Sequence, residues 1–463
     1  MNAILTDYAV NDPTWFYLSF LLLVGVFFRF SRLWAVRNFD LLSLLLITPG
    51  LLLVRRNAPV LGYTWLFVIS AVWLTRLLLD GLLHRRPRIE PNMNAAGLAF
   101  LCASAVLFLT IKVVHDPLPA ATVDSVRMAD RILDGQSPPV ETSPAATNTG
   151  PVPSLLAAPV VLTSRALAGT SEQEAGSDWI EQFTARSIAI LSHLSVILGL
   201  WAIGARIFGD SNTGIAMATL YMLHPCTAFD VQKVHHVLPA ALTLWAIRFY
   251  RRPIIAGTCL GLACGTMFFP VFLLPIWASF YGRRGMFRFG TAVAATAITV
   301  CLSLALASGD AAGLTRQYLG YFDWSELQFK VVDAAPGFWN NFESAYRIPV
   351  IVTFLLMLVT LTFWPGRKSL TQLIGRSAAI IVATQFWYSD QGGIYVLWYL
   401  PLVLLVIFRP VLDHHTFLPP EIMAAQAART EAALATATHA AGISPGSSGA
   451  ARFPVGRIGS QFR

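Results

Sequence analysis

Acidic side chains gather directly after a long apolar run, in residues 112–138. This stretch carries Asp116, Asp124, Asp130 and Asp134. A carboxylate that is held at a membrane interface and partly shielded from water can have a raised pKa and serve as a general base. The alternative is structural, because any chain that leaves lipid acquires polar residues. We interpret residues 112–138 as a candidate active-site loop.

The spacing within this loop predicts a short helix. Thr122 or Asp124 would cap its start, and Gly135 would stop it. Its apolar face would consist of Val126, Met128, Ala129, Ile132 and Leu133. Asp124 would then lie at the helix start, near the membrane, whereas Asp130 and Asp134 are expected to be solvated.

A second polar cluster occurs where the chain leaves one predicted span and almost at once enters the next. Its members are Asp230, Gln232, Lys233, His235 and His236. So many polar residues in so tight a connection indicate more than a spacer. Adjacent histidines on a helix point about 100° apart, so at most one of the two faces a given site. Neither a His-x3-His pair nor a nearby Glu at ligand spacing accompanies them, and the sequence therefore predicts no metal site.

These clusters must be positioned by a membrane scaffold. Of the 463 residues, 55% are hydrophobic and 13% are charged, and the mean hydropathy is +0.60. This composition excludes a soluble domain, and repeated apolar runs of about 17 to 25 residues predict transmembrane helices. The first run, near residues 15–30, has no basic segment before it and no small-residue cleavage site after it. We therefore predict a retained helix rather than a signal peptide.

The charge pattern predicts the orientation of the spans. The net charge is +8, but the arginines stand in short clusters beside apolar runs, which is the positive-inside pattern. No nucleic-acid partner is therefore expected. With these clusters in the cytoplasm, the N-terminus lies outside and the C-terminus lies in the cytoplasm. The five cysteines lie within or at the edge of apolar runs, so we expect small core residues rather than disulfides or metal ligands.

We predict an all-α integral membrane protein, a polytopic bundle of about 12–13 transmembrane helices in the cytoplasmic (inner) membrane. Two large outer-face loops, residues 115–182 and 308–347, would carry short amphipathic helices. The predicted domains are N-terminal transmembrane helices (1–94), a membrane domain that holds both polar clusters (95–410), and an Ala-rich cytoplasmic tail (411–463) that is partly disordered.

Three features depart from simple spans. The basic pair at 55–56 falls on the outer side, so the second span could instead be re-entrant around residues 49–50. Residues 256–282 are bounded by basic clusters and interrupted by glycine and proline, which favours two short half-spans over one helix. Arg76 and Asp80 are four apart and can pair on one helix face, which we interpret as structural.

Further segments have structural interpretations. His193 lies in the middle of a predicted span, where a buried, hydrogen-bonded histidine is expected. Residues 152–167 are apolar but short and interrupted by proline, so they would lie along the membrane or pack on the bundle. Residues 421–441 of the tail could form one helix.

Several motifs follow one another in a specific order. DSVRMADRILDG contains Asp124, Ala129, Leu133 and Gly135, and VQKVHHVLPAAL, WNNFESAYR and SDQGGIYVLWYLPLVL follow it. Together these stretches resemble the membrane glycosyltransferases of the GT-C fold. Within that fold they resemble the polyprenol-phosphate-dependent, mannosyltransferase-like group, glycosyltransferase family 87. The resemblance covers residues 95–410 and rests on the order and sidedness of the motifs.

The resemblance implies transfer of a sugar from a polyprenyl-phosphate donor to a glycan or lipid acceptor at the outer face. Asp124 would be the general base, with Asp116 as the reserve. Cationic candidates for stabilising the departing phosphate are Lys233, Arg186, Lys112, Lys330 and Arg347. Residues that would orient sugar hydroxyls are Gln232, His235 or His236, and Asn341. The lipid-linked sugar is a substrate, and the need for a divalent cation, Mg²⁺ or Mn²⁺, is left open.

Two other classes of function stay open. A transporter or other lipid-handling protein should show ionisable groups within its spans, paired broken helices and internal repeats. The sequence contains one broken segment and no convincing repeat, and its charges gather in outer loops. A non-catalytic GT-C relative that acts as an assembly subunit is the third possibility.

Overall fold

A computed structural model describes residues 12–56, 58–82, 90–136, 150–168, 177–308, 337–364, 368–410 and 412. Helices form all the regular structure in these residues, which contain no strand. Helices long and apolar enough to cross a membrane are Val36–Arg55, Pro59–Gly81, Ala95–His115, Asp178–Arg206 and Phe269–Ala305. Several such helices indicate a membrane protein, as the composition predicts.

The N-terminal helices form a hairpin that the sequence predicted only in part. Their bounds are α1 Asp12–Phe27, α2 Val36–Leu45, α3 Ile47–Arg55, α4 Pro59–Leu78 and η1 Leu79–Leu82. The α2–α3 segment bends at Leu46 and then continues, so it does not turn back at residues 49–50 as the re-entrant alternative required. Gly50 and Gly62 let α3 approach α4 closely, since a Cβ on Gly62 would lie 2.7 Å from the main-chain nitrogen of Val54.

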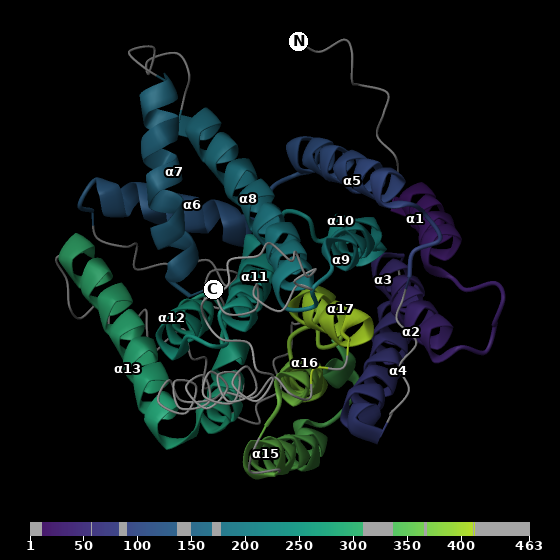
Figure 1. Cartoon of the computed structure of the whole chain (residues 1–463). Coiled ribbons are helices and arrows are strands. Elements are labelled where there is room, and N and C mark those ends of the chain that lie inside the picture. Colours follow the sequence, from purple (N-terminus) through teal and green to yellow (C-terminus); the bar gives the residue numbers. More distant parts are fainter. Residues whose placement is uncertain are drawn as a thin grey trace, which may run out of the picture. The chain divides into compact units, whose positions relative to one another are not determined.

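The middle of the chain surrounds the two polar clusters. Its helices are α5 Ala95–His115, α6 Ala120–Leu133, α7 Val152–Ala168, α8 Ser177–Arg206, α9 Ser211–Leu223, α10 Pro225–Phe229 and α11 Val234–Arg248. The helix α7 packs against α6 and α8 and contains Pro159 without breaking, so the apolar segment predicted at 152–167 packs on the bundle (Figure 1).

The segment predicted as two half-spans folds back on itself. The helix α12 (Pro253–Cys264) has 12 residues and is about 18 Å long, too short for a hydrocarbon core of about 30 Å. The chain then turns through η4 (Phe269–Leu273) into α13 (Leu274–Ser308), which is interrupted at Gly282 by a positive φ of 63°. The rings of Tyr250 and Phe280 lie 6.3 Å apart, so the chain has returned to the end where α12 begins. The predicted break in this segment, and the return of the chain to the end where it began, are therefore confirmed.

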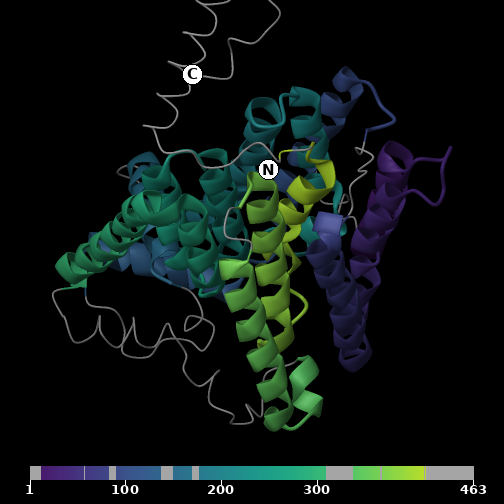
Figure 2. The ribbon, with the colours of Figure 1, turned by 60° about the horizontal axis from the view of Figure 1, so that its bottom comes forward.

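The last helices pack beside α4. Their bounds are η6 Phe338–Asn341, η7 Ser344–Tyr346, α15 Arg347–Phe363, α16 Leu370–Trp387, η8 Val396–Trp398 and α17 Leu400–Phe408. Figure 2 shows α15 and α16 as two green helices that lie side by side, and α16 also contacts α4. Lys330 and the helix predicted at 421–441 lie outside the described residues.

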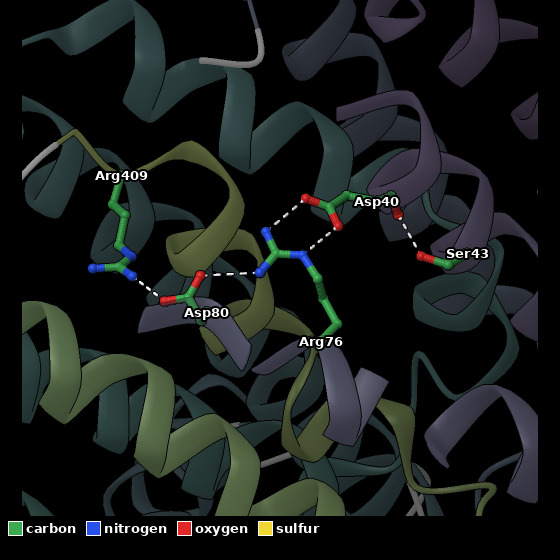
Figure 3. Close-up of polar contacts among 5 residues, drawn as sticks. All are labelled: Asp40, Ser43, Arg76, Asp80 and Arg409. Carbon is green, nitrogen blue, oxygen red and sulfur yellow. Dashed lines mark hydrogen bonds and ion pairs between the residues drawn. The ribbon is translucent and has the colours of Figure 1, made fainter. Parts of the chain in front are cut away.

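A buried network of four charged residues joins the N-terminal hairpin to the end of α17 (Figure 3). Arg76 contacts Asp40 at 2.8 Å and Asp80 at 3.0 Å, and Arg409 pairs with the second oxygen of Asp80. The predicted pair of Arg76 and Asp80 is thus confirmed, but its two distant partners were missed. Two cations balance two carboxylates, so the network is neutral, which is what burial of charge requires.

Candidate functional site

The structure brings the two polar clusters together through the side chain of Gln232. Its Nε2 donates hydrogen bonds to the main-chain oxygens of Val113, at 2.8 Å, and Asp116, at 2.7 Å. Both carbonyls lie at the C-terminal end of α5, where main-chain oxygens lack helical partners. Gln232 is buried. The turn before α11 is therefore fixed to the connection between α5 and α6.

The helix α6 begins earlier than predicted and has a different cap. It starts at Ala120 after Pro119, and neither Thr122 nor Asp124 caps it. The Thr122 hydroxyl instead donates to the main-chain oxygen of Gln232 at 3.0 Å. A tertiary hydrogen bond thus replaces the local capping bond that the sequence suggested. Asp124 lies in the second turn of the helix and not at its first residue.

The C-terminal half of α6 is held by α7. Gly135 ends the helix with a φ of 64°, as predicted. Asp130 and Asp134 are partly exposed, and both pair with Arg165 of α7, at 2.7 and 2.8 Å. The hydrogen bond from Arg165 lowers the pKa of Asp134 below its ordinary value. These two aspartates therefore stabilise the packing of α6 on α7.

A buried histidine supports the turn from the other side. One ring nitrogen of His193, Nε2, lies 2.9 Å from the main-chain oxygen of Val231, and Nδ1 lies 3.0 Å from the hydroxyl of Tyr221. Because a carbonyl only accepts, Nε2 carries the proton and Nδ1 accepts from the tyrosine. Both nitrogens are satisfied, which confirms the structural interpretation of His193.

Four buried polar atoms around this turn have neither a hydrogen-bond partner nor an ion-pair partner in the described part of the chain. They are Asp124 Oδ2, Arg186 Nε, Gln232 Oε1 and His235 Nδ1. They belong to α6, α8 and the 232–235 segment that leads into α11, and these elements contact one another. Each unsatisfied buried group costs about 1–3 kcal/mol, so a ligand that supplies the partners would be stabilised here.

Arg186 lies on a side of α8 that faces the turn. Residues 186, 190 and 193 are spaced by four and three, so their side chains share one helix face. His193 on this face reaches Val231, and a small cavity lies beside it. That cavity is lined by Val106, Leu109, Thr110, Val113, Ile190, His193, Leu194, Ile197, Met222 and Val231. Arg186 therefore shares a face of α8 with Ile190 and His193, which line the cavity.

The other charges near the turn are already paired. Lys112 contacts Asp116 at 2.7 Å, and Lys233 contacts Asp230 at 2.9 Å. Asp116 is therefore paired with a lysine four residues earlier in the chain, which makes it the weaker candidate for a general base. Among the predicted cations with described side chains, Arg186 has no ion-pair partner in the described structure.

Arg55 also belongs to this region, although it was not predicted as a site residue. Its guanidinium lies 3.8 Å from the ring centroid of Phe229 and donates to the main-chain oxygen of the same residue at 3.5 Å. Phe229 ends α10, directly before the 230–233 turn. The sequence did contain one indication of its role, because Arg55 falls on the predicted outer side, contrary to the positive-inside pattern.

Of the remaining predicted residues, Arg347 lies elsewhere and the side chain of Asn341 is outside what is described, whereas His236 directly follows His235 at the start of α11. Arg347 is buried and donates to the main-chain oxygen of Trp387 at 3.2 and 3.0 Å, so it caps the end of α16 rather than facing α6. Nothing is described of the side chain of Asn341. His236 is buried, and its Nδ1 accepts a hydrogen bond from Trp398 at 2.7 Å.

The chemistry of the site follows from its donors and acceptors. One carboxylate, one guanidinium, one amide oxygen and one imidazole nitrogen are available, and all belong to elements that are fixed by hydrogen bonds. Within the described residues, no group of three or more His, Cys, Asp or Glu side chains could hold a metal ion. The five cysteines all lie in the described residues and form no disulfide. The arrangement can accept a proton and stabilise an anion.

Comparisons with known proteins gave no relative. No protein-family model matches the chain, and no curated protein or solved structure matches it.

Proposed function

We propose that this protein is an integral membrane glycosyltransferase of the GT-C type. It would transfer a sugar from a polyprenyl-phosphate donor to a glycan or lipid acceptor. The observation that carries the proposal is the buried, unpartnered Oδ2 of Asp124, on a helix that Thr122 ties to the Gln232 turn. An acceptor hydroxyl would complete the hydrogen bonding of this carboxylate, and removing the hydroxyl proton is the step that the reaction requires.

In the proposed reaction, a carboxylate accepts the proton of the acceptor and cations stabilise the departing phosphate. Asp124 takes the proton of the acceptor hydroxyl while the hydroxyl oxygen forms a bond to the anomeric carbon of the sugar. The bond between that carbon and the phosphate oxygen breaks, and its electron pair leaves with the phosphate, which gains negative charge. Arg186, unpaired among the described residues, stabilises this charge, and Lys233 assists after exchanging its bond to Asp230.

The proposal includes a topology. About 12–13 spans would cross the cytoplasmic membrane, with the N-terminus outside and the C-terminus in the cytoplasm. Asp124 and the 230–233 turn would then lie at the outer face. The polyprenyl chain would lie along α12 and along η4 with the start of α13. These short helices would act as half-spans, which interrupt the lipid-facing surface of the bundle.

One observation favours a transporter as the second candidate. The half-spans within 253–282 are broken helices of the kind that transporters use at their substrate sites. A transporter would move its substrate across a liposome membrane without forming a new glycosidic bond. A glycosyltransferase would form that bond without net transport.

The test is sugar transfer by the purified protein in liposomes, with a panel of radiolabelled polyprenyl-phosphate sugars. We expect a labelled product from at least one donor, and loss of that product with Asp124→Asn. The matched control is Asp130→Asn on the same helix, since Asp130 pairs with Arg165 and has a structural role. A folded protein that forms no product from any donor, or an Asp124→Asn variant as active as the control, would contradict the proposal.

A further inference from the structure

The indole of Trp398 is held in one position against His236. Trp398 is fully buried. Its ring stacks on Tyr395 at 4.3 Å and on Phe269 at 4.4 Å, with interplanar angles of 5° and 18°. Its Nε1 donates to Nδ1 of His236 at 2.7 Å. Two parallel aromatic neighbours leave the indole little freedom to rotate, so the direction of this hydrogen bond is fixed.

This hydrogen bond decides which nitrogen of His236 carries the proton. An indole N–H can only donate, so Nδ1 must present its lone pair. A neutral imidazole with a bare Nδ1 carries its proton on Nε2. A protonated ring would place two N–H groups against each other. His236 is therefore held as the neutral Nε2–H form by geometry.

The groups around the ring do not offset that constraint. The His235 ring lies 4.1 Å away, and Lys233 precedes it on the same segment. From the other side the ring meets Tyr395, at 5.0 Å, whose hydroxyl donates to Asp390 at 3.2 Å. Asp390, which this tyrosine contacts, thus already accepts a hydrogen bond. Nothing among these described groups favours a second proton on His236.

The two adjacent histidines therefore differ. Nδ1 of His235 is buried without a partner, so no described contact selects its tautomer. Nε2 of His236 has no hydrogen-bond partner among the described residues, and the N–H that it must carry is available to a ligand. A donor of fixed direction and no charge suits the oxygen of a neutral hydroxyl.

We propose that His236 donates its Nε2–H to a sugar hydroxyl oxygen of the lipid-linked donor, and that Trp398 is the positioning residue that fixes this tautomer. The inference rests on the proposed glycosyl transfer for the identity of the ligand, whereas the tautomer itself can be tested without activity. It assigns to one nitrogen of one histidine a role that the sequence left open between His235 and His236.

The first experiment measures the tautomer directly. Protein labelled with ¹⁵N-histidine in nanodiscs is studied by NMR from pH 5 to pH 8, with His236→Phe used to assign the signals. We expect one unprotonated Nδ1 and one protonated Nε2 on His236 throughout this range. With Trp398→Phe we expect a mixture of tautomers and a cation at the acidic end. A protonated Nδ1 in the native protein would overturn the inference.

The second experiment uses transfer from a short-chain polyprenyl-phosphate mannose, or from whichever donor the panel identifies. We expect His236→Phe and Trp398→Phe to lower kcat/KM on the order of tenfold, and His236→Gln to restore part of the loss because its amide can donate. Trp277→Phe is the matched control, since that buried indole donates to Ser377 at 3.2 Å.

The outcomes separate the inference from the proposed function. If Asp124→Asn abolishes transfer while His236→Phe acts at the native rate, the role of His236 is wrong and the function stands. A larger loss with His235→Phe than with His236→Phe would likewise overturn the assignment. If no donor is used at all, the proposed function fails, and the ligand assigned to His236 fails with it. If NMR still finds Nε2 of His236 protonated in that case, the tautomer is a structural feature of the protein without a role in binding a sugar.

Discussion

The side chain of Gln232 donates a hydrogen bond to the main-chain oxygen of Asp116 at 2.7 Å, across 116 residues of sequence. The same residue accepts a hydrogen bond from Thr122 at its own main-chain oxygen. One glutamine therefore joins α5, α6 and the turn that precedes α11. The position of Asp124 relative to that turn depends on these three hydrogen bonds more than on any local feature of α6.

Replacing Gln232 with Met should weaken this junction. The variant keeps the volume of the side chain and loses two hydrogen bonds to the end of α5, so we expect a loss of about 1–2 kcal/mol in the free energy of unfolding. Equilibrium unfolding in mixed detergent micelles measures the change. The control is Gln372→Met, which affects only the capping box of α16. Equal stability of the Gln232 variant and the native protein would show that the junction is not needed.

Removing one charged residue from the buried network should lower the free energy of unfolding. Arg409→Leu leaves Asp80 with Arg76 as its described partner, and breaking a buried pair costs about 3–5 kcal/mol. Adding Asp80→Asn removes the uncompensated carboxylate, so the double variant should recover much of the loss. The same unfolding measurement tests both. A double variant no more stable than Arg409→Leu would argue against a charge-pairing role.

Close packing of α8 on α9 predicts a large effect of one methyl group. A Cβ on Gly204 would collide with the backbone of Gly214, and neither backbone can yield as a flexible side chain does. Gly204→Ala should therefore destabilise the protein by about 1–3 kcal/mol. Gly290→Ala is the control, because no atom lies within 4 Å of the added carbon, and helix propensity favours alanine by about 1 kcal/mol. Similar melting temperatures for the two variants would contradict this packing.

Long apolar runs made most of the helices predictable, because hydrocarbon length and composition are local properties. The break within 253–282 was predictable from its glycine and prolines, and the return of the chain from the basic residues at both ends. The interruption of the final predicted span was not predictable from the sequence. Residues 393–408 are apolar enough for a span, but the chain turns at Gly393 and uses η8 before the nine-residue α17.

The candidate site could be predicted as two clusters but not as one arrangement. Asp124 and His235 were identified by residue type and position, yet nothing local indicates that Gln232 reaches the end of α5. Contacts between residues that are far apart in the sequence also decide which charged side chains are paired. Asp40 is 36 residues from its partner Arg76, and Arg409 is 329 residues from its partner Asp80, so no spacing rule reveals these contacts.

The proposed topology has its own test. In a background without the five native cysteines, Arg127→Cys on α6 and Arg283→Cys after the break in α13 place reactive thiols at two exposed positions. We expect a membrane-impermeant thiol reagent to label position 127 in intact cells and position 283 only after permeabilisation. The reverse pattern would place Asp124 on the cytoplasmic side, away from a donor at the outer face.

The initial rate of sugar transfer by Asp124→Asn, compared with the native protein in the same liposomes, tests the central claim most directly. An amide cannot accept the hydroxyl proton, so we expect the rate to fall at least about 100-fold. The amount of folded protein should stay unchanged, and Asp130→Asn should act close to the native rate. An Asp124→Asn variant that transfers sugar at the native rate would show that Asp124 is not the general base.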